Sequence, residues 1–255
     1  MGTLYVVATP IGNLGDISAR ALEVLSKVDL IACEDTRQTI KLLNHFGIQK
    51  SLTSYHEFNE DKKAGELLSG LSGDRSVAIV SDAGTPAISD PGYRLVRLCR
   101  ERGIPVIAIP GANAAVTAIS VSGLPSDEFM FVGFLPARKN ARREKLMALA
   151  NVTCTLIFYE APHRIDAVLE DMQDVLGDRE VSVSREITKI HEEHLFGKLS
   201  HIRPQVKALG EFVIVVSGAT EFRQPPLTRE AVLETLGMTR NQLYDLFFKK
   251  GQTGL

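Results

Sequence analysis

Loops rich in glycine, proline and alanine are the first features of this sequence that could bind a small ligand. Three of them, at residues 9–16, 81–86 and 110–115, each follow a short apolar segment, and a fourth contains Phe134-Leu135-Pro136. Small residues let the main chain approach a ligand, and open α/β sheets bind ligands beyond the carboxyl ends of their strands. The loops therefore predict a ligand site at one sheet edge. The alternative is that they are only turns and helix starts, as Asp90-Pro91 would be if it capped a helix.

Ionisable side chains gather in two places where acid–base chemistry could occur. One group leaves an apolar segment at Glu34-Asp35-Thr36-Arg37, and a denser one contains Arg185, Glu186, Lys189, His191 and Glu192. If both groups faced one cleft, Lys189 could lower the cost of forming an alkoxide while Glu34 or Glu192 oriented the acceptor or took its proton. The alternatives are that Asp35 or Thr36 caps a helix and that the second group is a solvated charged edge.

Histidines raise the question of a metal site. In His191-Glu192-Glu193-His194 the imidazoles are three residues apart, not four as in H-E-x-x-H. In an extended segment they would point to opposite faces, so we expect no metal there. His56 and Glu57 follow a candidate strand and are further candidates for a functional role.

A basic run lies between Arg138 and Lys145. Its five cations are Arg138, Lys139, Arg142, Arg143 and Lys145. Such a cluster suits phosphates at the mouth of a cleft, although charge runs are more usually solvated helix faces.

Composition and missing motifs limit the possible classes of protein. The 255 residues include 44% hydrophobic and 24% charged residues and carry a net charge of −2, so nucleic acid would have to bind to a local patch. No two glycines form G-x-G and no G-x-x-x-x-G-K is present, which excludes the common dinucleotide loop and the P-loop. The three cysteines are far apart and read as core residues of a protein in a reducing compartment. With no signal peptide or membrane span in evidence, we expect a cytoplasmic protein.

Alternating strand and helix patterns must position the candidate residues. Strands are expected at 4–9, 30–33, 76–81 and 106–110, with a possible fifth at 51–55, and helices at 19–27, 36–46, 64–71 and 93–102. This alternation predicts a doubly wound α/β domain with a parallel sheet over residues 1–120.

A second α/β domain is expected over residues 121–220. Its strands are predicted at 129–134, 154–159, 181–184, 194–198 and 212–216, and its helices at 140–150 and 163–176. Because the late strands follow one another without helices, we expect a mixed sheet. Gln224-Pro225-Pro226 then begins a short tail, residues 221–255, with helical patterns at 229–236 and 240–249.

Seven motifs in order resemble the tetrapyrrole methylase superfamily, and most closely its ribosomal small-subunit RNA methyltransferase I group. They are T-P-I-G-N-L-G-D at 9–16, E-D-T-R at 34–37, S-D-A-G-T-P at 81–86, D-P-G at 90–92, I-P-G-A-N-A at 109–114, F-Y-E-A-P-H-R at 158–164, and R-E-I-T-K at 185–189 with H-E-E at 191–193. The tail after Pro226 is shorter than the helical segment usual in this group.

The resemblance implies a two-lobed α/β fold with S-adenosylmethionine in the cleft between the lobes, commonly in a homodimer. The implied reaction transfers the methyl group to the ribose 2′-hydroxyl of a cytidine in the decoding region of 16S rRNA, and it needs no metal. We expect the acceptor to be rRNA within the small ribosomal subunit, with free RNA as the alternative. The implied cofactor-binding residues are Pro10, Gly12, Asp82, Ala83, Gly84, Ile88, Ala114, Ala115, Phe158 and Tyr159.

For the reaction itself, the two polar groups described above supply Glu34, Lys189 and Glu192 as the expected catalytic residues. The expected RNA-binding residues are Arg37, Arg138, Lys139, Arg142 and Arg143. Two alternatives stay open: a methyltransferase that acts on a tetrapyrrole such as a precorrin, and a non-catalytic RNA-binding or ribosome-assembly factor.

Overall fold

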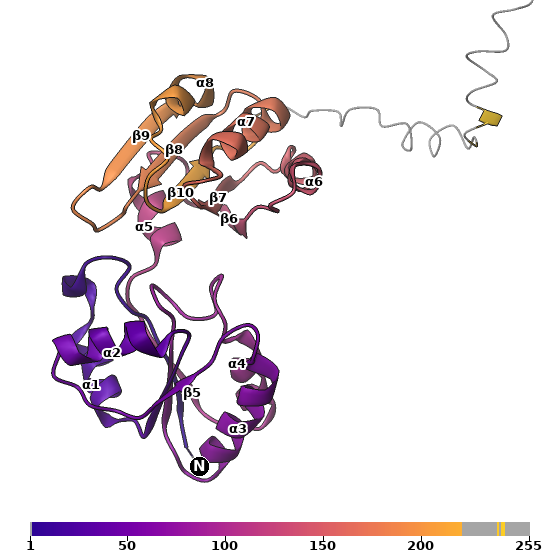
Figure 1. Cartoon of the computed structure of the whole chain (residues 1–255). Coiled ribbons are helices and arrows are strands. Elements are labelled where there is room, and N and C mark those ends of the chain that lie inside the picture. The colour runs from indigo at the N-terminus through magenta and orange to yellow at the C-terminus, as the bar shows by residue number, and fades with distance from the viewer. Residues whose placement is uncertain (1, 221–238, 240, 243–255) are drawn as a thin grey trace, which may run out of the picture.

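The structure is a computed structural model that describes residues 2–220, 239, 241 and 242. Two α/β lobes lie one above the other, and the N-terminus is at the end of the first lobe that points away from the second (Figure 1). The tail predicted at 221–255, with its two helical patterns, lies outside the described residues apart from these three. Within the described part of the chain, no helix is long and apolar enough to cross a membrane.

The first lobe contains a five-stranded parallel sheet in the order β3-β2-β4-β1-β5. Its strands are β1 (Leu4–Val7), β2 (Leu30–Cys33), β3 (Leu52–Ser54), β4 (Val77–Val80) and β5 (Val106–Ile109). All four predicted strands and the possible fifth, β3, are confirmed. The central strand β4 is buried along its whole length, as expected for a sheet covered on both faces. Because the strands are parallel, the loops after β1, β2 and β4 meet at one edge.

Helices cover both faces of this sheet, which confirms the doubly wound arrangement. One face carries α1 (Ala19–Lys27) and α2 (Thr36–His45), and the other carries α3 (Glu60–Ser72) and α4 (Tyr93–Glu101) (Figure 1). Asp35 caps α2 by accepting a hydrogen bond from the Arg37 N–H, so the capping role considered for it is confirmed.

The cap expected at Asp90-Pro91 is wrong. Helix α4 begins only at Tyr93, and its N-cap is Gly92, whose φ of 141° suits glycine far better than any other residue. Asp90 and Pro91 therefore stay in the preceding loop and do not cap α4.

The second lobe contains a five-stranded sheet that is mixed, as predicted, and its strand order is β6-β7-β10-β8-β9. Its strands are β6 (Phe129–Phe134), β7 (Thr155–Glu160), β8 (Glu180–Arg185), β9 (Glu193–Lys198) and β10 (Phe212–Val216). Strands β6 and β7 are parallel, and the other neighbouring pairs are antiparallel.

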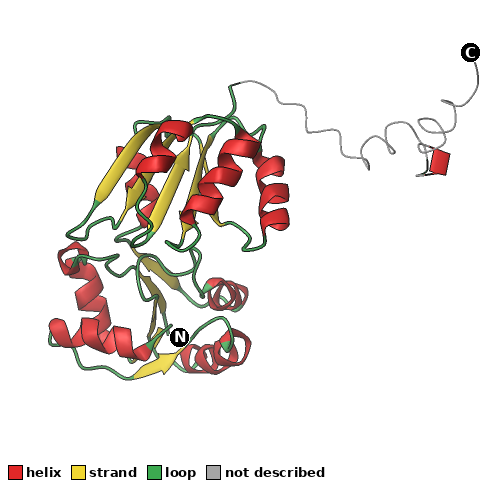
Figure 2. Cartoon of the chain, turned by 45° about the horizontal axis from the view of Figure 1, so that its top comes forward, coloured by secondary structure: helices red, strands yellow, loops and turns green. Residues whose placement is uncertain are grey.

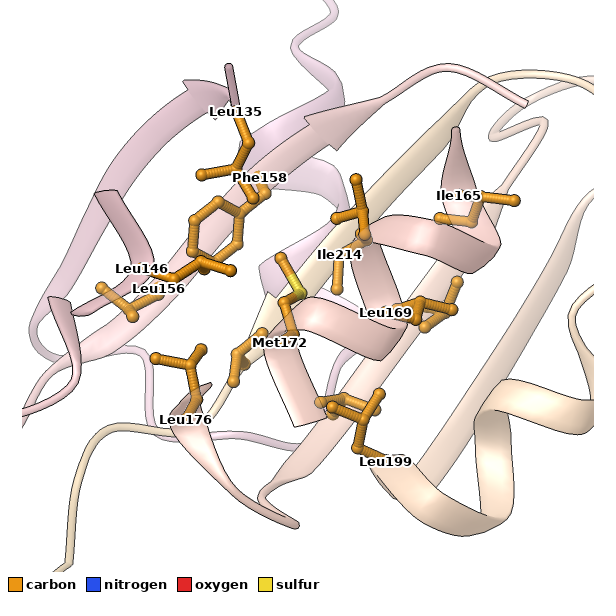
Figure 3. Packing of buried hydrophobic residues seen from close by; sticks show 14 of the residues in the cluster. Leu135, Leu146, Leu156, Phe158, Ile165, Leu169, Met172, Leu176, Leu199 and Ile214 are labelled. Carbon is orange, nitrogen blue, oxygen red and sulfur yellow. The ribbon is translucent and has the colours of Figure 1, made fainter. Parts of the chain in front are cut away.

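One face of the second sheet holds the larger apolar core of this lobe. Helices α6 (Lys139–Leu149), α7 (Ile165–Leu176) and the short α8 (Leu199–Ile202) lie on that face (Figure 2). Phe158 from β7 and Ile214 from β10 meet Leu169 and Met172 from α7 there (Figure 3). The chain also forms two short 3-10 helices, Leu14–Asp16 and Arg203–Gln205.

The opposite face of the second sheet is covered by α5 (Ala114–Val121), a helix that the sequence patterns do not predict. Its Ala115, Ala118 and Ile119 pack with Ile157 and Val213 of the sheet. The expected division at residue 120 would assign α5 to the first lobe, but these contacts join it to the second. We therefore use N-lobe for residues 2–113 and C-lobe for residues 114–220.

Candidate active site

A cavity of about 480 Å³ lies where the loops after β2 and β4 of the N-lobe meet the C-lobe, and we call it the main cavity. This volume is within the range of small-molecule sites, roughly 300–1,000 Å³. The N-lobe side is lined by Ile11, Glu34, Asp82, Ala83, Gly84, Thr85, Ile88, Ser89 and Asp90. The other side is lined by Asn113, Ala114, Phe134, Tyr159, Glu160, Ala161, Pro162, Ile187, Glu211, Phe212 and Val213.

The main-chain path of the N-lobe loops creates the N-lobe wall. Thr9 and Gly84 exchange two backbone hydrogen bonds, of 2.9 and 3.1 Å, that tie the loop after β1 to the loop after β4. Gly84 has a φ of 83°, which glycine adopts without strain, whereas Ala87 and Ser89 have φ values of 68° and 62° in the same loop. Left-handed non-glycine residues are unfavourable and concentrate at functional sites, so this loop has the character of a binding loop.

The lining of the main cavity is acidic. Burial raises the pKa of Glu34, and the Asp82 carboxylate raises it further. Burial also raises the pKa of Asp82, while a hydrogen bond of 3.0 Å from the Asp35 N–H opposes the rise. Burial raises the pKa of Asp90 to about 6. No lysine or arginine is among the described lining residues, so the main cavity favours a cationic ligand.

An aromatic group forms part of the C-lobe wall. Tyr159 projects from β7, and its hydroxyl accepts a hydrogen bond of 3.2 Å from the Ala115 N–H at the start of α5. Its ring contacts those of Phe131 and Phe134 edge-on, with centroids 5.0 and 5.7 Å away. Phe134 is half exposed in the lining, which leaves an aromatic face available to a ligand.

The residues expected to bind the cofactor fall into three groups. Six of them line the main cavity: Asp82, Ala83, Gly84, Ile88, Ala114 and Tyr159. Pro10 and Gly12 line an adjacent hollow, and Ala115 lies behind the wall, buried in the α5 contact. The expectation that Phe158 binds the cofactor needs correction. Successive strand residues point to opposite faces, so next to Tyr159 it is directed into the α7 core and is fully buried.

The adjacent hollow, of about 470 Å³, lies between the loop after β1, helix α2 and Lys189, and we call it the side hollow. It shares Ile11, Asp82, Ala83 and Glu211 with the main cavity. Glu34 and Lys189, which come from different lobes, are thus brought to two adjacent spaces.

The Lys189 ammonium is held by two carboxylates, Glu186 Oε1 at 2.8 Å and Glu211 Oε2 at 2.9 Å. Burial would lower the pKa of Lys189, but these hydrogen bonds outweigh burial and raise it. Lys189 is therefore a fixed cation and not a base.

Glu192 has a different place from the one expected for a catalytic residue. It lines neither of the two cavities described above. Its carboxylate accepts a hydrogen bond of 2.7 Å from the Thr188 N–H and contacts His194 Nε2 at 2.7 Å, a contact that lowers the Glu192 pKa. Glu192 thus holds the turn that presents Lys189. For the described residues, no group of three or more His, Cys, Asp or Glu side chains is arranged to hold a metal ion.

The expected RNA-binding run needs a correction at two of its positions. Arg142 is only 5% exposed and donates to Asp171, which is fully buried, at 2.7 Å. Arg143 is bound to Asp171 at 2.9 Å and to Asp174 at 2.8 Å. Both side chains reach Asp171 on α7, so the two arginines fasten α6 to α7. Arg138 and Lys139 are exposed, and so is Arg37, whose guanidinium pairs with Asp35.

Several lining residues were missed by the sequence analysis. Asp90 was interpreted as a cap, and Ile187 and Glu211 lie far along the chain from the glycine-rich loops that marked the site. The Glu160-Ala161-Pro162 segment belongs to a quoted motif, F-Y-E-A-P-H-R, and its position after a predicted strand is a signal that could have identified it.

Solved structures share the two-lobed architecture of this chain. The chain is similar to a diphthine synthase structure, with a TM-score of 0.67, 14% identity and coverage of 85% of this chain and 90% of that one. It is also similar to uroporphyrin-III C-methyl transferase from Thermus thermophilus complexed with S-adenyl homocysteine, with a TM-score of 0.58, 18% identity and coverage of 85% and 97%. At these identities the likeness concerns the fold, a two-lobed α/β fold that these transferases share.

Sequence comparison identifies the family. The model of the tetrapyrrole (corrin/porphyrin) methylases matches residues 3–203. The chain belongs to this family and, within it, to the ribosomal RNA small subunit methyltransferase I group. A relative with that name from Halalkalibacterium halodurans is 52% identical over 88% of this chain and 78% of its own length. Another from Vibrio cholerae is 50% identical over 94% of this chain and 85% of its own length.

Proposed function

We propose that this chain transfers a methyl group from S-adenosylmethionine to RNA of the small ribosomal subunit. The acceptor is the ribose 2′-hydroxyl of a cytidine in the decoding region of 16S rRNA. The observation that carries the proposal is the identity of about half of all aligned residues with relatives named for small-subunit rRNA methylation, over most of both chains.

The main cavity fits the proposed cofactor. S-adenosylmethionine supplies an electrophilic methyl group on a positively charged sulfur, and its amino group adds a second positive charge. Glu34, Asp82 and Asp90 place acidic groups in the lining to balance such charge. Ala83, Gly84 and Ala114 leave room for close approach of the main chain, and Tyr159 with Phe134 offers aromatic faces for an adenine ring.

The residues of the chain contribute positioning and proton removal. An in-line transfer needs donor and acceptor held in a near-attack arrangement, which contributes about 7–11 kcal/mol in well-oriented systems. The walls from both lobes provide that restraint and exclude water. Glu34, whose raised pKa makes its ionised form a stronger base, is the proton acceptor we assign in the main cavity, and Lys189 stabilises negative charge in the adjacent side hollow.

The two alternative functions meet less support. A tetrapyrrole acceptor agrees with the family name and with the uroporphyrin enzyme of the same fold, but that enzyme is only 18% identical. A non-catalytic RNA-binding factor has no need for an acidic small-molecule cavity beside the RNA surface.

Mapping of 2′-O-methylation tests the proposed function. rRNA from cells that lack the protein should lose one 2′-O-methyl group in the decoding region, and purified protein with S-adenosylmethionine should restore it on isolated small subunits. Comparing free 16S rRNA with the assembled subunit identifies the form of the acceptor. An unchanged methylation map, together with no binding of S-adenosylmethionine in calorimetry, would exclude the methyltransferase function.

The proposal also includes cytoplasmic action as a homodimer. Ribosomal RNA in the cytoplasm is the acceptor, which sets the location. Apolar side chains exposed on the edge strand β6 (Phe129 and Met130) and on α5 (Val116 and Val121) offer surface for a second copy. Light scattering should give twice the monomer mass, and a monomer at micromolar concentration would contradict this part of the proposal.

A further inference from the structure

We infer that the side hollow binds the sugar-phosphate backbone of the acceptor RNA, with Lys41 and Lys189 as phosphate contacts. The inference rests on the proposed function, because it identifies where the acceptor of that reaction enters. It assigns RNA contact to α2 and the loop after β1.

The side hollow and the main cavity are neighbours with common walls. Asp82 and Ala83 of the loop after β4 line both spaces, as do Ile11 and Glu211. A group in the side hollow is therefore separated from a ligand in the main cavity only by these shared residues. Two reactants that must meet can each occupy one space and react at the boundary.

The two spaces differ in charge. The described lining of the main cavity contains acidic groups and no lysine or arginine. The side hollow shares Asp82 and Glu211 with it but adds Lys41 and Lys189, together with the neutral side chains of Gln38 and Thr39. The first lining favours the cationic methyl donor, and the less negative second lining is the better place for a polyanion. This difference in charge disfavours binding of the RNA phosphates in the cofactor site.

Both lysines can donate to a phosphate. The Lys189 ammonium has three N–H groups and uses two of them for Glu186 and Glu211, which leaves one for a ligand. Lys41 is exposed on α2, and its contact with Gln38 Oε1 is long, at 3.3 Å. Arg37 lies one turn before Lys41, with its side chain 86% exposed, and extends the cationic face of α2.

Close contact between the lobes fixes the position of Lys189. A Cβ added to Gly12 would lie 2.5 Å from Lys189 Cγ, so the loop after β1 packs directly against this side chain. Leu14, at the other end of the loop, is 39% exposed at the rim and offers an apolar surface to a base or sugar. The hollow thus combines a fixed cation, a mobile cation and an apolar rim, as expected for a nucleotide.

Lys41→Ala and Lys41→Glu test the inference, with Lys27→Ala as the matched control. Lys27 is an exposed lysine on α1, in the same lobe, and lines neither the main cavity nor the side hollow. Affinity for purified small subunits is measured from low to high salt, and S-adenosylmethionine affinity is measured by calorimetry. Lys41→Ala should weaken subunit binding about tenfold at low salt, the size of one charge-assisted hydrogen bond. The slope of log affinity against log salt should fall by about 0.7–0.9.

Lys41→Glu should weaken subunit binding further, whereas Lys27→Ala should behave like the wild type and all variants should bind the cofactor normally. Unchanged subunit affinity and salt slope in both Lys41 variants, with an active wild type, would overturn the inference and leave the proposed function standing. A parallel Lys139→Glu variant reports on α6, and a loss confined to that variant would move the RNA to α6 and overturn the inference too. A wild type that neither binds S-adenosylmethionine nor methylates subunits would instead refute the proposed function.

Discussion

Asp90 differs from a surface carboxyl because burial raises its pKa to about 6, inside the range of practical assays. Below that pH it is neutral, and above it the carboxylate adds negative charge to the main cavity. A cationic cofactor favours the charged form, so its binding should strengthen as pH rises through about 6 and release a proton. Calorimetry of S-adenosylmethionine binding between pH 5 and 7.5 measures this, and Asp90→Asn should remove most of the pH dependence. Equal pH dependence in wild type and variant would show that Asp90 does not face the ligand.

Asp82 has two separable roles, one in the loop structure and one in the charge of the main cavity. Its Oδ1 accepts the Asp35 N–H at 3.0 Å, and its position in the lining places the carboxylate toward the ligand. Asp82→Asn keeps an acceptor for the Asp35 N–H and removes only the charge. We expect it to weaken S-adenosylmethionine binding about tenfold, as for one charge-assisted hydrogen bond, with an unchanged unfolding transition. Asp82→Ala should weaken binding at least as much. Normal affinity in both variants would contradict the role of Asp82.

Glu34 lines the main cavity, and its raised pKa makes it our candidate to accept the proton of the acceptor hydroxyl. General bases typically contribute about 10²–10⁴-fold to a rate. Glu34→Gln should therefore slow single-turnover methylation of small subunits by at least roughly a hundredfold, with nearly unchanged cofactor affinity. Glu66→Gln, at an exposed residue of α3 that lines neither space, is the control. A near-normal rate in Glu34→Gln would leave positioning of donor and acceptor as the main source of catalysis.

Lys189→Ala distinguishes the two roles given to this lysine, which are stabilising negative charge during the reaction and contacting a phosphate of the RNA. Removal of the ammonium leaves Glu186 and Glu211 without their common partner, so the negative charge at the boundary increases. We expect single-turnover methylation to fall by at least roughly a hundredfold, while cofactor affinity stays nearly normal. Rate measurements at saturating subunit concentration decide between the roles. A defect that saturating RNA removes would assign Lys189 to binding alone.

At the scale of elements, helix α6 is fastened to α7 by a buried ionic group. The Asp171 carboxylate is fully buried and accepts hydrogen bonds from both Arg142 and Arg143, and Arg143 also reaches the more exposed Asp174. Removal of one partner from a buried pair leaves the other charge uncompensated, which costs about 3–5 kcal/mol. Asp171→Ala should lower the free energy of unfolding by that amount in urea denaturation, whereas the exposed Asp174→Ala should cost at most about 1 kcal/mol. Equal effects of the two variants would refute the buried role of Asp171.

The elements also explain how far the sequence predicts this structure. Strands such as β4 were predicted because a continuous apolar run between turn residues is typical of a strand buried on both faces. Helix α5 was missed because it is apolar almost all round and lacks the polar face that creates a helical pattern. Its Ala115 and Ala118 read like loop or strand residues until the second sheet is present to cover them.

Only part of the candidate site was predicted, because only some of its residues have a local signal in the sequence. Asp82 and Gly84 lie in a loop that directly follows a strand, so local sequence marks them as ligand-facing. Glu211 and Ile187 reach the lining only because two antiparallel strands of the C-lobe bring them there, a long-range effect without a local signal. The direction of Arg142, toward Asp171, likewise depends on how α6 packs against α7.

At the scale of the whole molecule, each lobe supplies what the other lacks. The N-lobe brings three strand ends with acidic groups and small residues, and the C-lobe brings Tyr159, Phe134 and the Lys189 turn. Each sheet has its own apolar core, so the lobes can keep their internal structure while the space between them changes. A ligand in the main cavity therefore acts as a connection between two separately folded bodies.

This arrangement predicts that S-adenosylmethionine stabilises both lobes together. A ligand at a hundred times its Kd raises the free energy of unfolding by about 2.7 kcal/mol when it binds only the folded state. Because the lining comes from both lobes, amide hydrogen exchange should slow in the loop after β4 and also at Ala161 and Val213. Hydrogen-exchange mass spectrometry with and without the cofactor measures both regions, and Asp82→Asn at the same cofactor concentration should reduce protection in each. Protection confined to the N-lobe would place the cofactor on the loop after β4 alone, and the C-lobe wall would then serve only the acceptor.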